Sequence, residues 1–254
     1  TVLRLGKKVV DAIVTQHQPT ILRVDFAAQT TLQRSEVAAG RQQLQHMLRL
    51  EDDLSTFYAV CKNDPKRSWV ASRGGGRLLR SATVFEDLMK LLFTTNTSWT
   101  STEQMTRNLV TALGSKSPNG LRAFPTAKQC LQDESFYREV VRCGYRATAA
   151  MELAAGFATG ELTNETFLSP QPSEEIWQRL CALRGFGPYA AGQAMRLCGH
   201  SDRLAIDSWC RSTIAKIEGR KKPPSDKAIE RRYAKLAPFQ GLAMWCDLTA
   251  SWHT

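Results

Sequence analysis

The chain has 254 residues, of which 43% are hydrophobic and 23% are charged, a balance typical of a folded globular protein and not of a disordered or fibrous one. No apolar run approaches the roughly 18 residues that a membrane span requires, so we expect no membrane contact. Lysine and arginine number 34 against 24 acidic residues, giving a net charge of +10, and this excess favours a polyanionic partner such as nucleic acid.

The seven cysteines include no CxxC pair. Their odd number and wide spacing argue against a disulfide framework, a zinc ribbon and an iron–sulfur cluster. We therefore predict reduced, mostly buried thiols and no required cofactor.

The N-terminal residues 1–80 carry the strand signals. In the segment 20–26, Leu22, Val24 and Phe26 alternate with more polar positions, and the segment 9–15 is a second candidate strand. The glycine triplet at 74–76 indicates a turn or boundary. These features predict an N-terminal antiparallel β subdomain over residues 1–80.

Helical periodicity dominates residues 81–254. Apolar residues at 84, 85, 88, 91 and 92 form a stripe at helical spacing. Further helices are predicted over 101–114, 134–144, 145–160 and 173–185, with Gly114 and Gly144 as stops and Ser173 as an N-cap. The connectors 115–126, 169–172 and 219–225 are short, as loops within one bundle are. The predicted class is α+β, mainly α.

The segment 174–199 has the pattern of a helix-hairpin-helix. A helix ends at Leu183 or Arg184, the turn Gly185, Phe186 and Gly187 follows, and a second helix begins at Pro188 and stops at Gly199. The glycines permit close approach of another surface, and the amides at the start of the second helix favour a phosphate. From the glycines alone, an ordinary helical hairpin is an equal alternative.

Asp207 lies in the loop 200–210, after the apolar residues Leu204, Ala205 and Ile206 and at the start of another amphipathic helix. Taken in isolation, an aspartate at this position is most simply an N-cap. Beside the hairpin, it becomes a candidate catalytic carboxylate.

The hairpin and its following aspartate resemble the signature of the helix-hairpin-helix DNA glycosylases. The segments 47–64 and 74–99, the heptapeptide 124–130 and the tetrapeptide 144–147 are similar to 8-oxoguanine DNA glycosylases in particular. The resemblance covers roughly residues 47–250. It implies an enzyme that extrudes a base from double-stranded DNA and cleaves its N-glycosidic bond.

The resemblance assigns Asp207 to catalysis, where a carboxylate stabilises an oxocarbenium-like sugar and orients or deprotonates water. It assigns Asn96, Tyr145 and Arg146 to filling the gap that the extruded nucleotide leaves. From the residues alone, Asn96 is equally a cap, Tyr145 a core aromatic and Arg146 a surface charge.

The resemblance also assigns DNA contacts to the hairpin at Gly185, Gly187 and Tyr189. It implies that the backbone carbonyls of Cys181, Leu183 and Phe186 hold a structural monovalent cation that bridges to a DNA phosphate. The basic tract 216–235 contains eight lysines and arginines against three acids, which fits either further phosphate contacts or a solvated surface.

Tyr189 departs from the related enzymes that also nick DNA, in which the matching residue is a lysine that forms a Schiff base. A phenol cannot form an imine. We therefore predict a monofunctional enzyme that uses water activated at Asp207.

The segment that supplies base recognition in 8-oxoguanine enzymes also departs. The pocket predicted here consists of Trp209, Met244, Trp245, Asp247 and Leu248. Its aromatic residues suit stacking on an alkylated purine, whereas Asp247 could accept a hydrogen bond from an exocyclic amine. Oxidised purine, alkylated purine and modified cytosine all remain open as substrates, and Met244 and Trp245 are equally well explained as core residues.

The predicted partner is double-stranded DNA, bound by a monomer without any membrane. The sequence after Thr1 shows no secretory signal or transit peptide, which predicts the bacterial cytoplasm or the eukaryotic nucleus as location. A non-catalytic helix-hairpin-helix DNA-binding protein is the alternative from a different functional class. It would need the hairpin and the basic charge but not Asp207.

Overall fold

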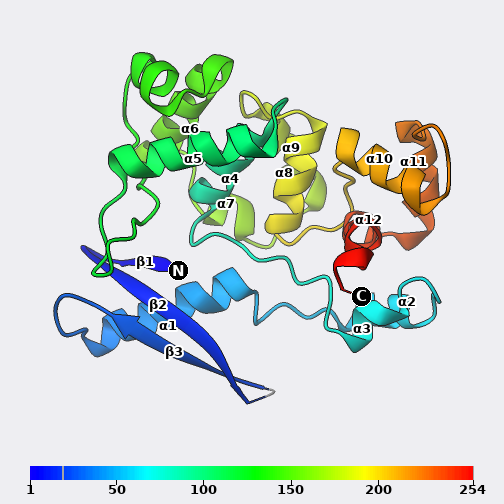
Figure 1. Ribbon diagram of the computed structural model, residues 1–254, viewed down its shortest axis with the longest axis horizontal. Coiled ribbons are helices and arrows are strands. Elements are labelled where there is room, and N and C mark those ends of the chain that lie inside the picture. The colour runs from blue at the N-terminus through cyan, green and yellow to red at the C-terminus, as the bar shows by residue number, and fades with distance from the viewer. Residues whose placement is uncertain (19, 254) are drawn as a thin grey trace. The chain divides into compact units, whose positions relative to one another are not determined.

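The computed structural model describes residues 1–18 and 20–253 (Figure 1). The contacts within the chain define two compact units. Unit 1 consists of residues 1–50 and 80–164, and unit 2 of residues 51–79 and 165–254. This division differs from the predicted one at residue 80, because each unit combines a segment from before that boundary with a segment from after it.

Unit 1 begins with a three-stranded antiparallel sheet in the order β1-β2-β3, formed by Val2–Leu5, Lys8–Gln18 and Ile21–Ala27. Val14 pairs with Val24. Leu3, Leu5 and Val10 pack with Leu44 of α1 (Arg34–Leu48) in a small core, and Figure 1 shows α1 lying along the sheet. Strand structure ends at Ala27, so the β-rich part of the chain is shorter than the predicted 1–80.

The other helices of unit 1 confirm most of the predicted periodicity. They are α4 (Val84–Thr94), α5 (Trp99–Leu113), a π-helix (Phe136–Val141), a 3-10 turn (Gly144–Arg146) and α6 (Ala147–Thr159). The predicted stop at Gly144 differs: the π-helix ends at Val141, its C-cap Arg142 adopts the left-handed conformation, and Gly144 begins the 3-10 turn.

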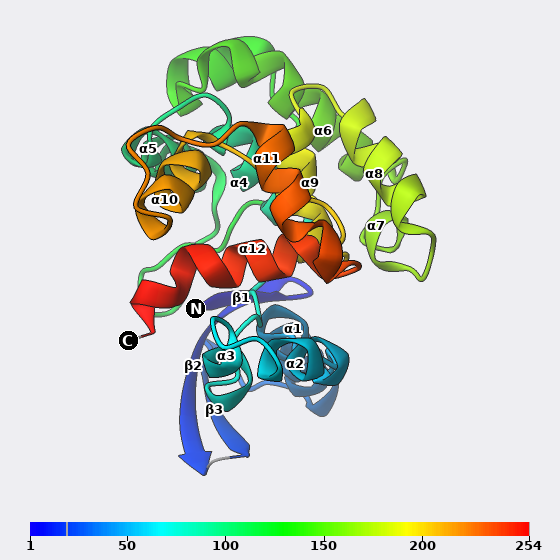
Figure 2. The same cartoon turned by 90° about the vertical axis from the view of Figure 1, so that its right-hand side faces the viewer.

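Unit 2 is helical throughout. Its helices are α2 (Ser55–Lys62), α3 (Ser68–Ser72), α7 (Glu165–Leu168), α8 (Ser173–Ala182), α9 (Pro188–Leu197), α10 (Ser208–Ile217), α11 (Asp226–Tyr233) and α12 (Gln240–Thr249), with 3-10 turns at Ala234–Leu236 and Ala250–Trp252. Figure 2 shows α12, in red, running alongside α10 and α11, in orange. Apolar residues of these three helices form one core with Phe57, Cys61 and Val70 of α2 and α3. The mainly helical α+β class is confirmed.

All seven cysteines are free in the structure, and five are buried, which confirms the predicted burial of most thiols. Burial raises the pKa of Cys61 and Cys210 to about 11 and that of Cys246 to about 12. At neutral pH these three thiols are therefore protonated. Within the described residues, no helix is long and apolar enough to cross a membrane.

Candidate active site

The hairpin between α8 and α9 has the predicted form. Leu183 caps the end of α8, and its carbonyl accepts a hydrogen bond from the N–H of Phe186 at 3.1 Å. Gly185 adopts a φ of 84°, a left-handed conformation that favours glycine. Gly187 is the N-cap of α9, and no side chain caps that helix. The start of α9 therefore presents backbone amides on an exposed turn, the arrangement that binds phosphate.

Ser173 has a different role from the predicted N-cap. Pro172 occupies the N-cap position of α8, and the Ser173 hydroxyl lies 2.7 Å from both carboxylate oxygens of Asp202. The carboxylate is the stronger acceptor for this hydroxyl. Ser173 therefore ties the start of α8 to the loop that leads to Asp207.

Two glycines allow that loop to pack closely against the neighbouring helices. A Cβ at Gly192 of α9 would lie 2.7 Å from the carbonyl oxygen of Leu204, too close for any side chain. A Cβ at Gly241 of α12 would overlap the carbonyl oxygen of Arg203. The N–H of Gly241 also donates to the carbonyl of Ser201 at 2.6 Å. The position of Asp207 thus depends on two glycines that the sequence pattern did not single out, because neither belongs to a turn.

Asp207 is the N-cap of α10, and its Oδ1 accepts a hydrogen bond from the N–H of Cys210 at 2.7 Å. Among the described residues, none donates a hydrogen bond to Oδ2. The side chain is only half-buried. Asp207 is thus an N-cap, and this role is compatible with the catalytic hypothesis. The cap orients the carboxylate through Oδ1, and Oδ2 is available to another partner.

Arg196 of α9 is a charged residue near Asp207 that the sequence analysis missed. It is only 3% exposed, and burial lowers the pKa of its guanidinium to about 10, although the charges of Tyr189 and Asp207 act in the opposite direction. It donates to the carbonyl of Gly241 at 3.3 Å. At neutral pH Arg196 is therefore a buried cation within electrostatic reach of Asp207.

Three tryptophans form a cluster in unit 2 that includes Trp209, two residues after Asp207. The ring centroid of Trp252 lies 6.1 Å from that of Trp209 and 5.9 Å from that of Trp245. Trp209 and Trp252 are 43% and 63% exposed, and the guanidinium of Arg196 lies 5.1 Å from the ring centroid of Trp245. Trp252 was missed because it follows the predicted pocket segment, in a 3-10 turn.

The remaining residues of the predicted base pocket lie elsewhere. Met244 and Leu248 are 1% and 4% exposed and belong to the core of unit 2. Asp247 accepts hydrogen bonds from Arg67 at 2.6 Å and from the hydroxyl of Tyr233 at 2.9 Å. This geometry corrects the assignment of all three: Met244 and Leu248 are packing residues, and the Asp247 carboxylate is engaged in a buried ion pair.

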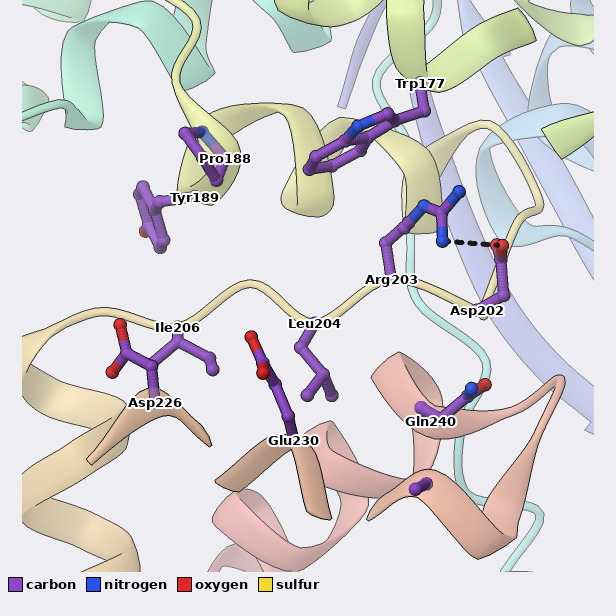
Figure 3. Close-up of a pocket in the computed structure, with 11 residues that line it drawn as sticks. Trp177, Pro188, Tyr189, Asp202, Arg203, Leu204, Ile206, Asp226, Glu230 and Gln240 are labelled. Carbon is purple, nitrogen blue, oxygen red and sulfur yellow. Dashed lines mark ion pairs between the residues drawn. The ribbon is translucent and has the colours of Figure 1, made fainter. Parts of the chain in front are cut away.

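Next to the hairpin lies a cavity of about 390 Å³, lined from the hairpin by Pro188 and Tyr189 and from the Asp207 loop by Leu204 and Ile206 (Figure 3). Figure 3 also shows Glu230 of α11 pointing toward this loop. Asp202, Asp226 and Glu230 contribute carboxylates to the lining, against the single guanidinium of Arg203. This charge disfavours a phosphate inside the cavity.

Unit 1 brings together the three residues assigned to filling the gap in DNA. The guanidinium of Arg146 donates to Thr95 Oγ1 at 3.1 Å and to the carbonyl of Asn96 at 3.2 Å, and it lies 4.5 Å from the ring centroid of Tyr145. Arg146 is 7% exposed and Tyr145 62% exposed. Asn96 has a φ of 44°, which asparagine tolerates better than most residues. The buried guanidinium of Arg146 therefore holds the backbone of Asn96 and the ring of Tyr145 in place, while both of these side chains are exposed.

Some basic residues of the tract 216–235 form ion pairs within the protein, and others are exposed to solvent. Arg220 and Arg232 both pair with Glu218, and Arg211 pairs with Asp226 at 2.7 Å. Lys221, Lys222 and Lys227 are exposed. Part of the tract thus stabilises the surface of α10 and α11, and the exposed lysines leave positive charge facing solvent.

Comparison with solved structures places the fold. A 3-methyladenine DNA glycosylase from Archaeoglobus fulgidus superposes on this chain with a TM-score of 0.76 at 19% identity. The superposition covers 100% of this chain and 87% of that glycosylase. A Clostridium acetobutylicum 8-oxoguanine glycosylase/lyase, solved with double-stranded DNA containing cytosine opposite 8-oxoguanine, has a TM-score of 0.74 at 19% identity, over 99% of this chain and 84% of the other.

A third structure, MBOgg1 in complex with a low-affinity DNA ligand, has a TM-score of 0.73 at 18% identity, over 97% of this chain and 83% of the other. No family model matches the sequence, and no curated protein matches it. At these identities the likeness concerns the fold. The chain has the helix-hairpin-helix DNA glycosylase fold.

Proposed function

We propose that this protein is a DNA glycosylase that extrudes a modified base from duplex DNA and hydrolyses its N-glycosidic bond. The observation that carries the proposal is the position of Asp207 in a chain of this fold. Its carboxylate is oriented by the start of α10, and its loop is packed against the α8–α9 hairpin. A DNA-binding protein without catalytic activity would need this carboxylate only as the N-cap of α10, which engages Oδ1 and leaves Oδ2 without a function.

In the proposed complex, the amides at the start of α9 bind a DNA phosphate, because the exposed turn at Gly187 lets the strand approach. Asn96 and Tyr145 occupy the gap left by the extruded nucleotide, with Arg146 holding them in place. The net charge of +10 makes binding strongly dependent on salt.

Catalysis rests on Asp207 stabilising positive charge on the sugar as the glycosidic bond breaks, and on the same carboxylate orienting the attacking water. Arg196 contributes indirectly, because its buried guanidinium donates to the carbonyl of Gly241 and lies against the ring of Trp245, a member of the tryptophan cluster. Arg196 is thus a positioning residue rather than a catalytic one.

We propose that the enzyme is monofunctional. Tyr189, at the start of α9, is the hairpin residue that matches the lysine of glycosylase/lyases, and it lines the cavity beside the Asp207 loop. The next lysine along the chain is Lys216, in the last turn of α10. Water is therefore the proposed nucleophile.

Among the three substrate classes, the geometry favours an alkylated purine. The exposed tryptophans near Asp207 provide ring surfaces for stacking, whereas Asp247 already has partners for its carboxylate and Met244 is buried. Stacking contacts depend less on the pattern of donors and acceptors of a base than edge contacts do. An oxidised purine and a modified cytosine are the competing outcomes.

We also propose that the backbone carbonyls of Cys181, Leu183 and Phe186 hold a monovalent cation, because neutral carbonyl oxygens are ligands that suit such an ion. The Leu183 carbonyl accepts one hydrogen bond from Phe186, and a carbonyl oxygen has a second lone pair for a ligand. These three residues would hold the proposed cation, which would add positive charge at the phosphate contact.

The decisive experiment incubates the enzyme with duplexes that each carry one modified base and scores abasic sites by alkaline cleavage. We expect base release from one class of duplex, no strand cleavage before alkali, and no protein–DNA adduct on borohydride reduction. A trapped adduct would refute the water mechanism. Salt-dependent binding of every duplex without base release from any would favour the non-catalytic alternative.

A further inference from the structure

Unit 1 contains a second cavity, of about 360 Å³, to which the proposed reaction gives no role. Its walls come from β1, α1, α4, α6 and the segments 123–127 and 162–164. All of these belong to unit 1, whereas the hairpin and Asp207 belong to unit 2. The volume lies within the range of small-molecule sites, which begins at about 300 Å³.

Three phenylalanines form the apolar part of this cavity. The ring centroid of Phe85 lies 5.4 Å from that of Phe157 and 6.1 Å from that of Phe124, and the rings are tilted against each other. Aromatic walls of this kind favour a flat ligand, because a planar ring can stack on one of them and meet the edge of another.

Arg4 and Gln43 provide the polar part. The Gln43 amide donates to the Arg4 carbonyl at 2.8 Å, which fixes the orientation of the amide. The Arg4 guanidinium donates through Nη2 to Ser115 Oγ at 3.1 Å and to Gln129 Oε1 at 3.2 Å. Arg4 Nε and Gln43 Oε1 are both buried and have no hydrogen-bond partner among the described residues.

A buried donor and a buried acceptor without hydrogen-bond partners each destabilise the fold. Both atoms belong to side chains that line the cavity. A ligand that satisfies both must present an acceptor to Arg4 and a donor to Gln43. Nucleobases carry neighbouring donors and acceptors on a planar edge and stack on aromatic side chains.

We propose that this cavity binds a nucleobase or nucleoside as a free ligand, with the ring against the half-buried Phe124 and Phe157 and one edge on Arg4 and Gln43. An anionic ligand fits less well. Glu86 also lines the cavity, and an anion without a donor would leave Gln43 Oε1 without a partner. The inference rests on unit 1 alone and does not depend on the proposed glycosylase activity.

The test is isothermal titration of the full chain with adenine, cytosine and their nucleosides, with indole and benzoate as ligands that lack a complementary edge. We expect one saturable site for at least one base or nucleoside, in the micromolar to millimolar range. Arg4→Lys keeps the charge but removes the Nε donor, and it should weaken binding at least tenfold. Arg23→Lys, on the exposed part of β3, is the matched control and should bind as the wild type does.

Gln43→Met provides a second variant in case Arg4→Lys impairs folding, which thermal denaturation would reveal. Trp252→Ala separates this site from the proposed active site, and it should leave the binding of free base unchanged. The proposal would be overturned by the absence of saturable binding to the wild type, or by binding to both cavity variants that is as tight as to the wild type. Binding of indole or benzoate as tight as that of any base, or loss of binding in Trp252→Ala, would also overturn it.

Discussion

Two regions of unit 2 use their polar and apolar residues in opposite ways. One is the α8–α9 hairpin together with the start of α10, and the other is the last helix, α12. The hairpin and Asp207 present exposed backbone and a half-buried carboxylate, placed by caps and turns. On α12, Met244 and Leu248 are packed in the core and Asp247 is held in an ion pair. The residues proposed to act on DNA are therefore held in place by caps and turns without being buried in the core or paired with another charge. Five predictions test this difference between the two regions.

The largest expected effect comes from Asp207→Asn. Asparagine is as good an N-cap as aspartate, so the helix start should be preserved while the negative charge is lost. We expect base release in single-turnover assays to fall by roughly 1,000-fold or more, with unchanged affinity for DNA. Excision at a near-normal rate would remove Asp207 from the mechanism.

Asp247→Asn should instead damage the fold. Its carboxylate, with a side chain 8% exposed, pairs with Arg67 at 2.6 Å. Burial works against the charge on Arg67, but the hydrogen bond and the charge of Asp247 outweigh it and raise the pKa of Arg67. The variant leaves Arg67 with Asp64 as its remaining acidic partner. Loss of the charged hydrogen bonds to Asp247 should therefore lower the free energy of unfolding by roughly 1–3 kcal/mol, measured by urea denaturation. A variant of normal stability with altered base preference would return Asp247 to the base pocket.

Trp252→Ala should affect activity more than stability, because the side chain is 63% exposed. Stacking of a base on an aromatic residue contributes about 1–3 kcal/mol. We therefore expect excision to fall roughly 10- to 100-fold, with a melting temperature close to that of the wild type. The matched variant Met244→Ala should show the reverse pattern, losing roughly 2–5 kcal/mol of stability. If both variants lost stability equally, the tryptophan cluster would be ordinary packing.

Gly187→Asn adds a side chain at the proposed phosphate contact. A Cβ at this position meets nothing within 4 Å, and asparagine is a favourable N-cap, so the hairpin should tolerate the change. We expect DNA binding to weaken by roughly tenfold at about 100 mM salt without loss of stability. Unchanged affinity in a fluorescence anisotropy titration would place the DNA backbone elsewhere.

The smallest effect concerns the exposed ion pair between Asp226 and Arg211. The hydrogen bond from Arg211 lowers the pKa of Asp226 below its ordinary value of 3.8. The stability it provides is therefore present above about pH 4 and is lost as the pH falls through the lowered pKa. Asp226→Asn should lower stability by less than about 1 kcal/mol at pH 6, and the difference should vanish near pH 2. A loss as large as that of Asp247→Asn would break the distinction between exposed and buried pairs.

Local signals in the sequence predicted the elements that carry the proposed chemistry. The hairpin depends on Gly185, Gly187 and Pro188 within a few residues of one another, and the helix at 84–94 depends on its own apolar stripe. Asp207 follows the same rule, because an N-cap is defined by the four residues around it. The structure contains these features as predicted because each one depends on residues that are close together along the chain.

Tertiary contacts decided the rest. Nothing local distinguishes Met244, buried in the core, from Trp252, exposed beside Trp209, since both follow from how α12 packs on α10 and α11. The Arg67–Asp247 pair joins residues 180 positions apart, and the buried position of Arg196 depends on the Gly241 carbonyl of another helix. The sequence alone therefore determined the hairpin and the place of Asp207 at the start of α10, whereas the packing of its loop depends on Gly192 and Gly241 of other elements. Long-range packing determined which side chains around Asp207 are left free to meet a base, because burial is a property of the assembled core.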